Sequence, residues 1–135
     1  MKIYFTLAEA NALLPLVKLE LEKLQGIKKQ YRDKYEELHQ LKDYHQKQGG
    51  LPEGSDPYFT LECEMDFLQL EGNTLLSSFE LKGVQLKDID SGLIDFPALL
   101  NGQEVLLCWR QGEESVAHYH GLHDGFAGRR KLTEE

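Results

Sequence analysis

The side chains able to do acid–base, nucleophilic or metal chemistry are concentrated in the last third of this sequence. Between positions 83 and 132 it holds acids, histidines, arginines and a cysteine, namely Asp88, Asp90, Asp95, Cys108, Arg110, His118, His120, His123, Arg129 and Arg130. No spacing among them matches a motif that fixes one reaction. The sequence therefore leaves open whether the protein is an enzyme.

Three histidines favour a metal site. His118 and His120 are two residues apart in an expected strand, so their side chains point to the same face, and His123 lies in the turn that follows. Three imidazoles with an open position suit zinc or another divalent transition metal. This alternative makes the protein a metal-dependent hydrolase with Asp95 or Glu114 as base or extra ligand. The competing interpretation is that the histidines are ordinary polar residues of a sheet.

The leading interpretation is a polar pocket that binds a small, anionic ligand. We expect it to be built from Asp95, Arg110, His120 and Arg129. The segment GFAGRR at 125–130 adds two glycines beside two guanidiniums, a pattern that can cradle phosphate or carboxylate. The alternative is a glycine-rich turn held by arginine, since glycine serves backbone geometry first.

The acidic residues have two interpretations. Asp88, Asp90 and Asp95 border a glycine turn, and carboxylates held close together can have one pKa raised for proton transfer. The structural alternative has Asp90 capping the turn. In that alternative Asp95 pairs with Arg110 or Arg129, because buried acids are generally paired.

Cys108 is either a nucleophile or a small buried residue. A thiolate needs a nearby base or positive charge, which His120 would supply. Its place between Leu107 and Trp109 in an expected strand favours burial instead. With Cys63 as the second cysteine, the chain has too few for a disulfide framework, and we expect both thiols to be free.

Two helices are expected before these residues. Thr6 and Glu9 form a capping box that begins the first helix, and Pro15 predicts a kink or a separate short opening helix. A heptad seam follows, with apolar and long side chains at Val17, Leu21, Leu24, Lys28, Tyr31, Tyr35, Leu38, Lys42 and His45.

The glycine- and proline-rich segment 46–57 predicts a loop, after which the second helix begins. Its seam is Leu61, Met65, Leu68, Gly72, Leu75 and Phe79. If the helices fold back about the centre of the loop, Gly72 lies opposite Tyr31 and Tyr35.

The period changes to that of strands after Gly83. Four β-prone runs (VQLKDI, GLIDF, EVLLCW and VAHYH) are separated by turn signals, of which Asn101-Gly102 is the strongest. We predict an antiparallel meander of three or four strands, with one face covered by the base of the helices. The tail, 121–132, is expected to be an ordered loop packed back by Phe126 and Leu132.

The fold class predicted is therefore α+β, in one domain spanning 1–135. It consists of a long antiparallel, coiled-coil-like helical hairpin (6–81) and a small C-terminal β-meander with a Gly/Arg tail (83–132). A chain of 135 residues is too short for two ordinary cores. Leu19, Ile27 and Leu41 fall off the first seam, so we expect a homodimer in which a second copy covers them.

Charge and hydropathy narrow the class of protein. The net charge is −8, divided as 9 − 7 = +2 over residues 1–48 and 6 − 16 = −10 over 49–135. This balance argues against binding to nucleic acid or to anionic lipid, and it favours attraction between a basic first helix and an acidic second one. No apolar run is long enough to cross a membrane, and the N-terminus lacks the apolar region of a signal peptide. We expect a cytoplasmic protein.

Four long segments resemble a known family. They are FTLAEANALLP (5–15), KDIDSGLIDFPA (87–98), VLLCWRQGE (105–113) and HGLHDGFAGR (120–129). In this order they are similar to the mostly bacterial family of domain of unknown function 2203 (DUF2203). The resemblance implies that Asp95, Cys108, Arg110, His120 and Arg129 belong to a shared pattern. It implies no activity, and His118 and His123 stand where relatives usually carry other residues.

Overall fold

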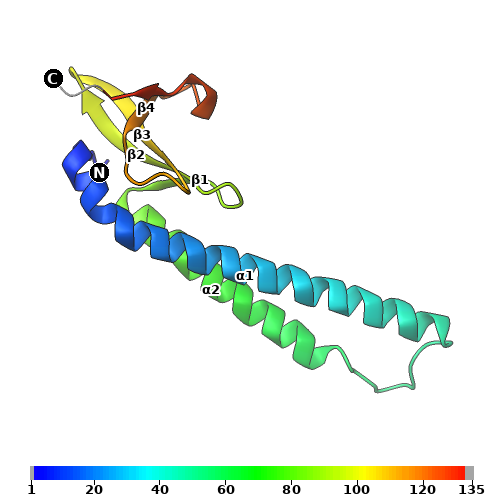
Figure 1. Cartoon of the computed structure of the whole chain (residues 1–135). Helices are drawn as coiled ribbons and strands as arrows, with labels where there is room; N and C mark the ends of the chain where they lie inside the picture. Colours follow the sequence, from blue (N-terminus) through cyan, green and yellow to red (C-terminus); the bar gives the residue numbers. More distant parts are fainter. Residues whose placement is uncertain (1, 133–135) are drawn as a thin grey trace.

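The chain folds into two long helices followed by a five-stranded antiparallel sheet, which confirms the α+β class (Figure 1). The computed structural model describes residues 2–132. Its elements are α1 (Leu7–Lys47), α2 (Phe59–Lys82), β1 (Gln85–Asp88), β2 (Leu93–Leu100), β3 (Gln103–Arg110), β4 (His118–Gly121), the short 3-10 helix η1 (Phe126–Gly128) and β5 (Arg130–Lys131). Within residues 2–132, neither helix has a stretch long and apolar enough to cross a bilayer.

The first helix begins as predicted. The Thr6 hydroxyl accepts from the Glu9 amide at 3.1 Å, and the Glu9 carboxylate accepts from the Thr6 amide at 2.9 Å. α1 is continuous through Pro15, so the alternative of a separate opening helix is wrong. Its first turns lie at an angle to the remainder (Figure 1). A bend is expected there because proline has no amide hydrogen and crowds the preceding turn.

α2 runs back along α1, and the two helices lie side by side (Figure 1). Near the sheet the Lys82 Nζ lies 2.7 Å from a Glu20 carboxylate oxygen, and further along Lys34 pairs with Glu64. Both pairs join a basic to an acidic residue across the helices. Only Lys34–Glu64 joins a base of α1 to an acid of α2, as the charge asymmetry predicts, whereas Lys82–Glu20 joins a base of α2 to an acid of α1.

The register of the helices differs from the predicted one. Gly72 is buried against α1, but a Cβ there would lie 3.7 Å from Ile27 Cγ2 and 3.8 Å from Leu24 Cδ1. The predicted neighbours Tyr31 and Tyr35 are further along, and Tyr35 is 49% exposed. Side-chain packing and ion pairs set this register, whereas the prediction took the middle of the connecting loop as its centre.

The residues expected off the helical seam are partly covered within the chain. Ile27 is half-buried, and half-buried Leu41 packs on a cluster formed by Leu38, Leu61 and Met65. Leu19 remains 57% exposed. Two of the three residues thus have partial cover within the chain, and the homodimer stays a prediction.

The sheet is a meander in the order β1-β2-β3-β4-β5. Asn101 and Gly102 both have positive φ, at 52° and 78°, as a tight type I′ hairpin turn requires, so the predicted β2–β3 hairpin is confirmed. There are five strands instead of three or four because the tail contributes β5, which pairs with β4.

One face of the sheet packs on the helices and the other does not. Inward residues such as Ile94, Phe96 and Trp109 join Val17 and Phe79 in the main hydrophobic core. Side chains alternate along a strand, so the neighbours of these residues point to the outer face. Asp95, Cys108 and His120, three of the residues predicted to do chemistry, lie on that outer face beside residues of the tail.

Candidate functional site

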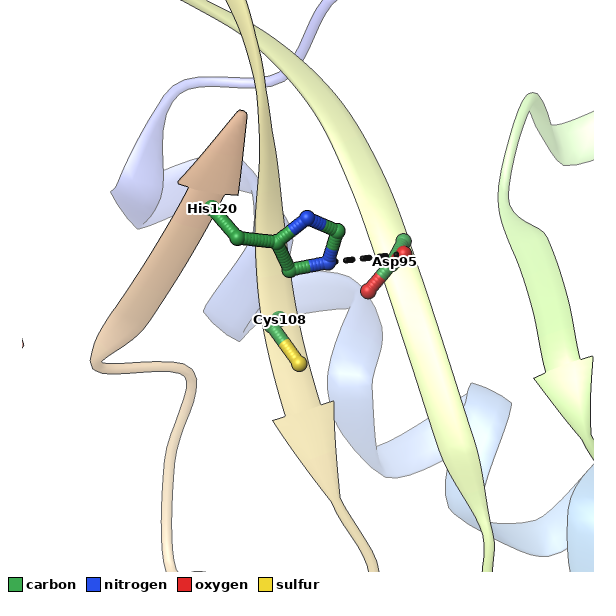
Figure 2. Close-up of side chains that lie close together, drawn as sticks. All are labelled: Asp95, Cys108 and His120. Atoms are coloured by element: carbon green, nitrogen blue, oxygen red, sulfur yellow. Dashed lines mark hydrogen bonds and ion pairs between the residues drawn. The ribbon is translucent and has the colours of Figure 1, made fainter. Parts of the chain in front are cut away.

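Three buried polar side chains meet on three neighbouring strands. Asp95 on β2, Cys108 on β3 and His120 on β4 are only 2%, 1% and 4% exposed (Figure 2). The β2–β3 hairpin sets Asp95 directly opposite Cys108, while β4 pairs His120 with Leu106, two residues along β3. The imidazole therefore reaches diagonally across β3 toward Asp95.

Both nitrogens of the His120 ring face hydrogen-bond acceptors. Nε2 lies 3.1 Å from the Asp95 carboxylate oxygen Oδ2, and Nδ1 lies 2.8 Å from the Gly121 carbonyl oxygen. A neutral imidazole carries one N–H, which serves only one of these acceptors. A metal ion between Nε2 and the Asp95 carboxylate, or one further proton, would satisfy both acceptors.

Cys108 completes the group but is poorly suited to act as a nucleophile. Burial raises the pKa of its thiol to about 11, and the Asp95 carboxylate adds to this rise while the Arg129 guanidinium opposes it. A thiol with such a pKa holds its proton at neutral pH, whereas nucleophilic cysteines have a lowered pKa. The structural alternative, a buried small residue, fits better in the metal-free protein.

The ligand atoms of Asp95, Cys108 and His120 all lie within 4.8 Å of one another, and no other such group of three occurs within residues 2–132. The three predicted histidine ligands do not form one. His118 Nδ1 lies 3.6 Å from a Glu113 carboxylate oxygen, and His123 is exposed. Of the three predicted histidine ligands, only His120 therefore belongs to the group of possible ligands that the structure brings together.

Arg129 pairs with Glu113 and not with Asp95. Its two terminal nitrogens lie 2.9 and 2.8 Å from the two Glu113 carboxylate oxygens, and its guanidinium stacks 4.3 Å from the centre of the Phe126 ring. This pairing lowers the pKa of Glu113 and raises that of Arg129. Arg110 is exposed, with its guanidinium 5.6 Å from the same ring. The two arginines thus hold the tail through Phe126 and Glu113.

The other acidic residues do not join Asp95. Asp88 accepts hydrogen bonds from the amide and the hydroxyl of Ser91, which lower the pKa of Asp88. Asp90 pairs with Lys28 of α1 at 2.9 Å. Asp88 therefore caps the turn in place of Asp90, and the predicted carboxylate cluster does not form.

A cavity of about 270 Å³ opens beside the buried group. Asp95, Cys108 and His120 line this cavity, together with the polar residues Lys87 and His123. The rest of its wall is mainly apolar and includes Leu93, Leu106, Leu122 and Phe126. Arg110, Arg129 and Glu114 do not line it, and Glu114 lies in an exposed turn. Of the four residues predicted for the ligand pocket, Asp95 and His120 are therefore brought together.

Two features of the site were not predicted. Lys87 was not recognised as part of it, and nothing in its local sequence marks it. The pairing of Asp95 with Cys108 did have a signal, because a two-residue Asn-Gly turn at 101–102 fixes which positions of the two strands are opposite.

The comparisons agree with the resemblance noted in the sequence. A family model described as an uncharacterised conserved protein, DUF2203, matches residues 3–132. No curated protein and no solved structure gives a significant match.

Proposed function

Because the chain belongs to the DUF2203 family, whose description names no activity, we propose a function from the residues themselves. The protein binds a divalent transition metal of the zinc class through Asp95, Cys108 and His120. It presents that metal to a small ligand in the cavity on the outer face of the sheet. The buried thiol suits the reducing cytoplasm.

The observation that carries this proposal is the pair of contacts made by the two nitrogens of the His120 ring. The short contact of Nδ1 with the Gly121 carbonyl, at 2.8 Å, favours the proton on that nitrogen. The lone pair of Nε2 then points at the Asp95 carboxylate, 3.1 Å away, with Cys108 in the same group. Metal-binding histidines typically donate their other N–H to a carbonyl or carboxylate in this way.

The ligand types indicate which metal fits. One nitrogen, one oxygen and one sulfur suit zinc and similar transition metals, while calcium and magnesium require oxygen ligands. Charge also balances, since the Asp95 carboxylate and a Cys108 thiolate offset a divalent ion. Glu113 offsets the neighbouring positive charge of Arg129 through its two hydrogen bonds.

Three protein ligands leave one position of a tetrahedral zinc site open. The cavity beside the three ligands supplies room for a small molecule at that position, and the Lys87 ammonium in its lining favours an anionic one. The ligand pocket is thus proposed with Lys87 in place of Arg110 and Arg129.

Hydrolysis is the second candidate function. A zinc ion lowers the pKa of bound water and polarises carbonyl groups. His123 supports this candidate because its exposed side chain lines the cavity, and histidine is a common proton-transfer residue in enzymes. Glu114 is not positioned for the role of base.

The test is metal content in protein purified without chelator and after reconstitution with zinc or cobalt. We expect about one metal per chain, lost in Cys108→Ser and retained in Cys63→Ser, which changes the exposed cysteine of α2. With cobalt, the thiolate bond should produce a charge-transfer absorption that Cys108→Ser removes. No bound metal after reconstitution, or equal binding by both variants, would refute the proposal.

A further inference from the structure

α2 carries an apolar stripe on the side that faces away from α1. Its members recur at steps of three and four residues, with small hydroxyl residues at positions 74 and 77, and are Phe59, Cys63, Phe67, Leu70 and Leu81. Phe59, Phe67, Leu70 and Leu81 are 64%, 68%, 63% and 82% exposed. We call this set the α2 stripe. Four large apolar side chains on one helix face are more than the scattered exposure of ordinary surfaces.

Acidic residues border the α2 stripe on both sides. α2 contains one basic and five acidic residues, a net charge of 1 − 5 = −4, and no lysine or arginine lies between positions 48 and 81. Among residues 2–132, Glu62, Asp66, Glu71 and Glu80 form no ion pair, and Glu64 pairs only with Lys34. The one basic residue, Lys82, is already bound to Glu20. The acids bordering the stripe are therefore largely uncompensated.

We propose that the α2 stripe is a docking surface for a basic amphipathic helix of another protein. Such a partner has apolar residues at helical spacing, which pack on Phe67 and Leu70, and lysines or arginines beside them, which meet the acidic borders. From Phe59 to Leu81 the stripe extends about 33 Å, at about 1.5 Å per residue, so the partner helix needs about six turns. This inference does not depend on the metal site.

A second copy of the chain is a poorer occupant. Packing α2 against α2 of another copy sets acidic borders beside acidic borders, which repel. The outer face of α1 offers only Leu16 and Leu19 as large apolar residues exposed above 40% between Pro15 and Tyr31. Charge complementarity thus favours a basic partner over self-association.

The test uses two synthetic helical peptides of about 22 residues with the same apolar heptad positions. One carries lysine and the other glutamate at the remaining positions. We expect the lysine peptide to bind, with affinity falling as salt is raised, and the glutamate peptide not to bind. Phe67→Ser with Leu70→Ser should weaken binding at least about tenfold, while Leu99→Ser on the sheet, which is 55% exposed, should leave it unchanged.

Cys63 provides a local readout because it is exposed within the stripe. The bound lysine peptide should slow its reaction with a thiol reagent, measured in the Cys108→Ser background. Binding that leaves Cys63 equally reactive, or that survives the Phe67→Ser and Leu70→Ser double change, would overturn the proposal. Sedimentation showing a dimer that the same double change dissociates would also overturn it, by identifying a second copy as the occupant.

Discussion

Asp95→Asn separates a metal site from a simple buried ion pair. The amide has nearly the same shape as the carboxylate, and its NH₂ group can donate to His120 Nε2 while Nδ1–H donates to the Gly121 carbonyl. Both nitrogens of a neutral imidazole then have a partner, with no extra positive charge. We therefore expect the metal-free variant to be within about 1 kcal/mol of the metal-free wild type in unfolding free energy.

The same change should remove most of the effect of zinc. A ligand that binds only the folded state at 100 times its dissociation constant adds about 2.7 kcal/mol to the unfolding free energy. In a domain of this size that corresponds to a rise in melting temperature of roughly 10 °C. The wild type should show this rise, and Asp95→Asn should show less than about a third of it.

Thermal unfolding with zinc and with chelator measures both quantities. The matched control is Asp90→Asn, which changes an exposed aspartate paired with Lys28 and should retain the full zinc effect. The contrasting variant His120→Ala strands the buried Asp95 carboxylate and should cost about 3–5 kcal/mol without metal. If Asp95→Asn keeps the full rise in melting temperature with zinc, or loses as much stability as His120→Ala, then His120 and Asp95 do not bind a metal in the way proposed.

Three further predictions concern the contacts that hold the site in place. Asn11→Ala should lower the unfolding free energy by about 2 kcal/mol in denaturant titration, because the Asn11 side chain hydrogen-bonds both the backbone N–H and the carbonyl of Val116, at 2.8 and 3.1 Å. Gly92→Ala should cost about 2–3 kcal/mol by the same measurement, since φ is +70° and a Cβ would lie 2.5 Å from Gln111 Cβ; a neutral result would show that this turn can relax. Glu113→Gln should cost about 1–2 kcal/mol at pH 7 through the lost pairing with Arg129. Because this pairing lowers the Glu113 pKa from 4.5, its stabilisation is present above that pH and is lost as pH falls through the lowered value, so the wild type and the glutamine variant should converge in acid. A difference that persists unchanged in acid would mean that Glu113 acts through packing instead of charge.

The sequence predicted individual helix starts and turns better than the contacts between separate elements. The Thr6–Glu9 capping box and the Asn101-Gly102 turn are local, so a few neighbouring residues determine them. The helix register is not local, because packing at Gly72 and the ion pairs decide it. A side-chain period indicates which face is buried, but it leaves the offset between two helices open.

The candidate metal site shows the same limit. Same-face residues on one strand, such as His118 and His120, have Cα atoms about 6.6–6.8 Å apart. Directly opposite residues on adjacent strands are about 4.5–5.5 Å apart, which brings their side chains closer together. Asp95 and Cys108 are such a pair, so ligands gathered across strands more readily than along one. A prediction based on residue type along one segment selected histidines and missed this arrangement.

The position of the tail has a consequence for the order in which the site can form. Pairing of β2, β3 and β4 is enough to bring Asp95, Cys108 and His120 together. Residues 122–132 then supply Leu122, His123, Gly125 and Phe126 to the cavity wall, and Arg129 fastens this tail to Glu113. If the site binds a metal as proposed, an ion that enters before the tail is fastened needs no opening of the finished fold.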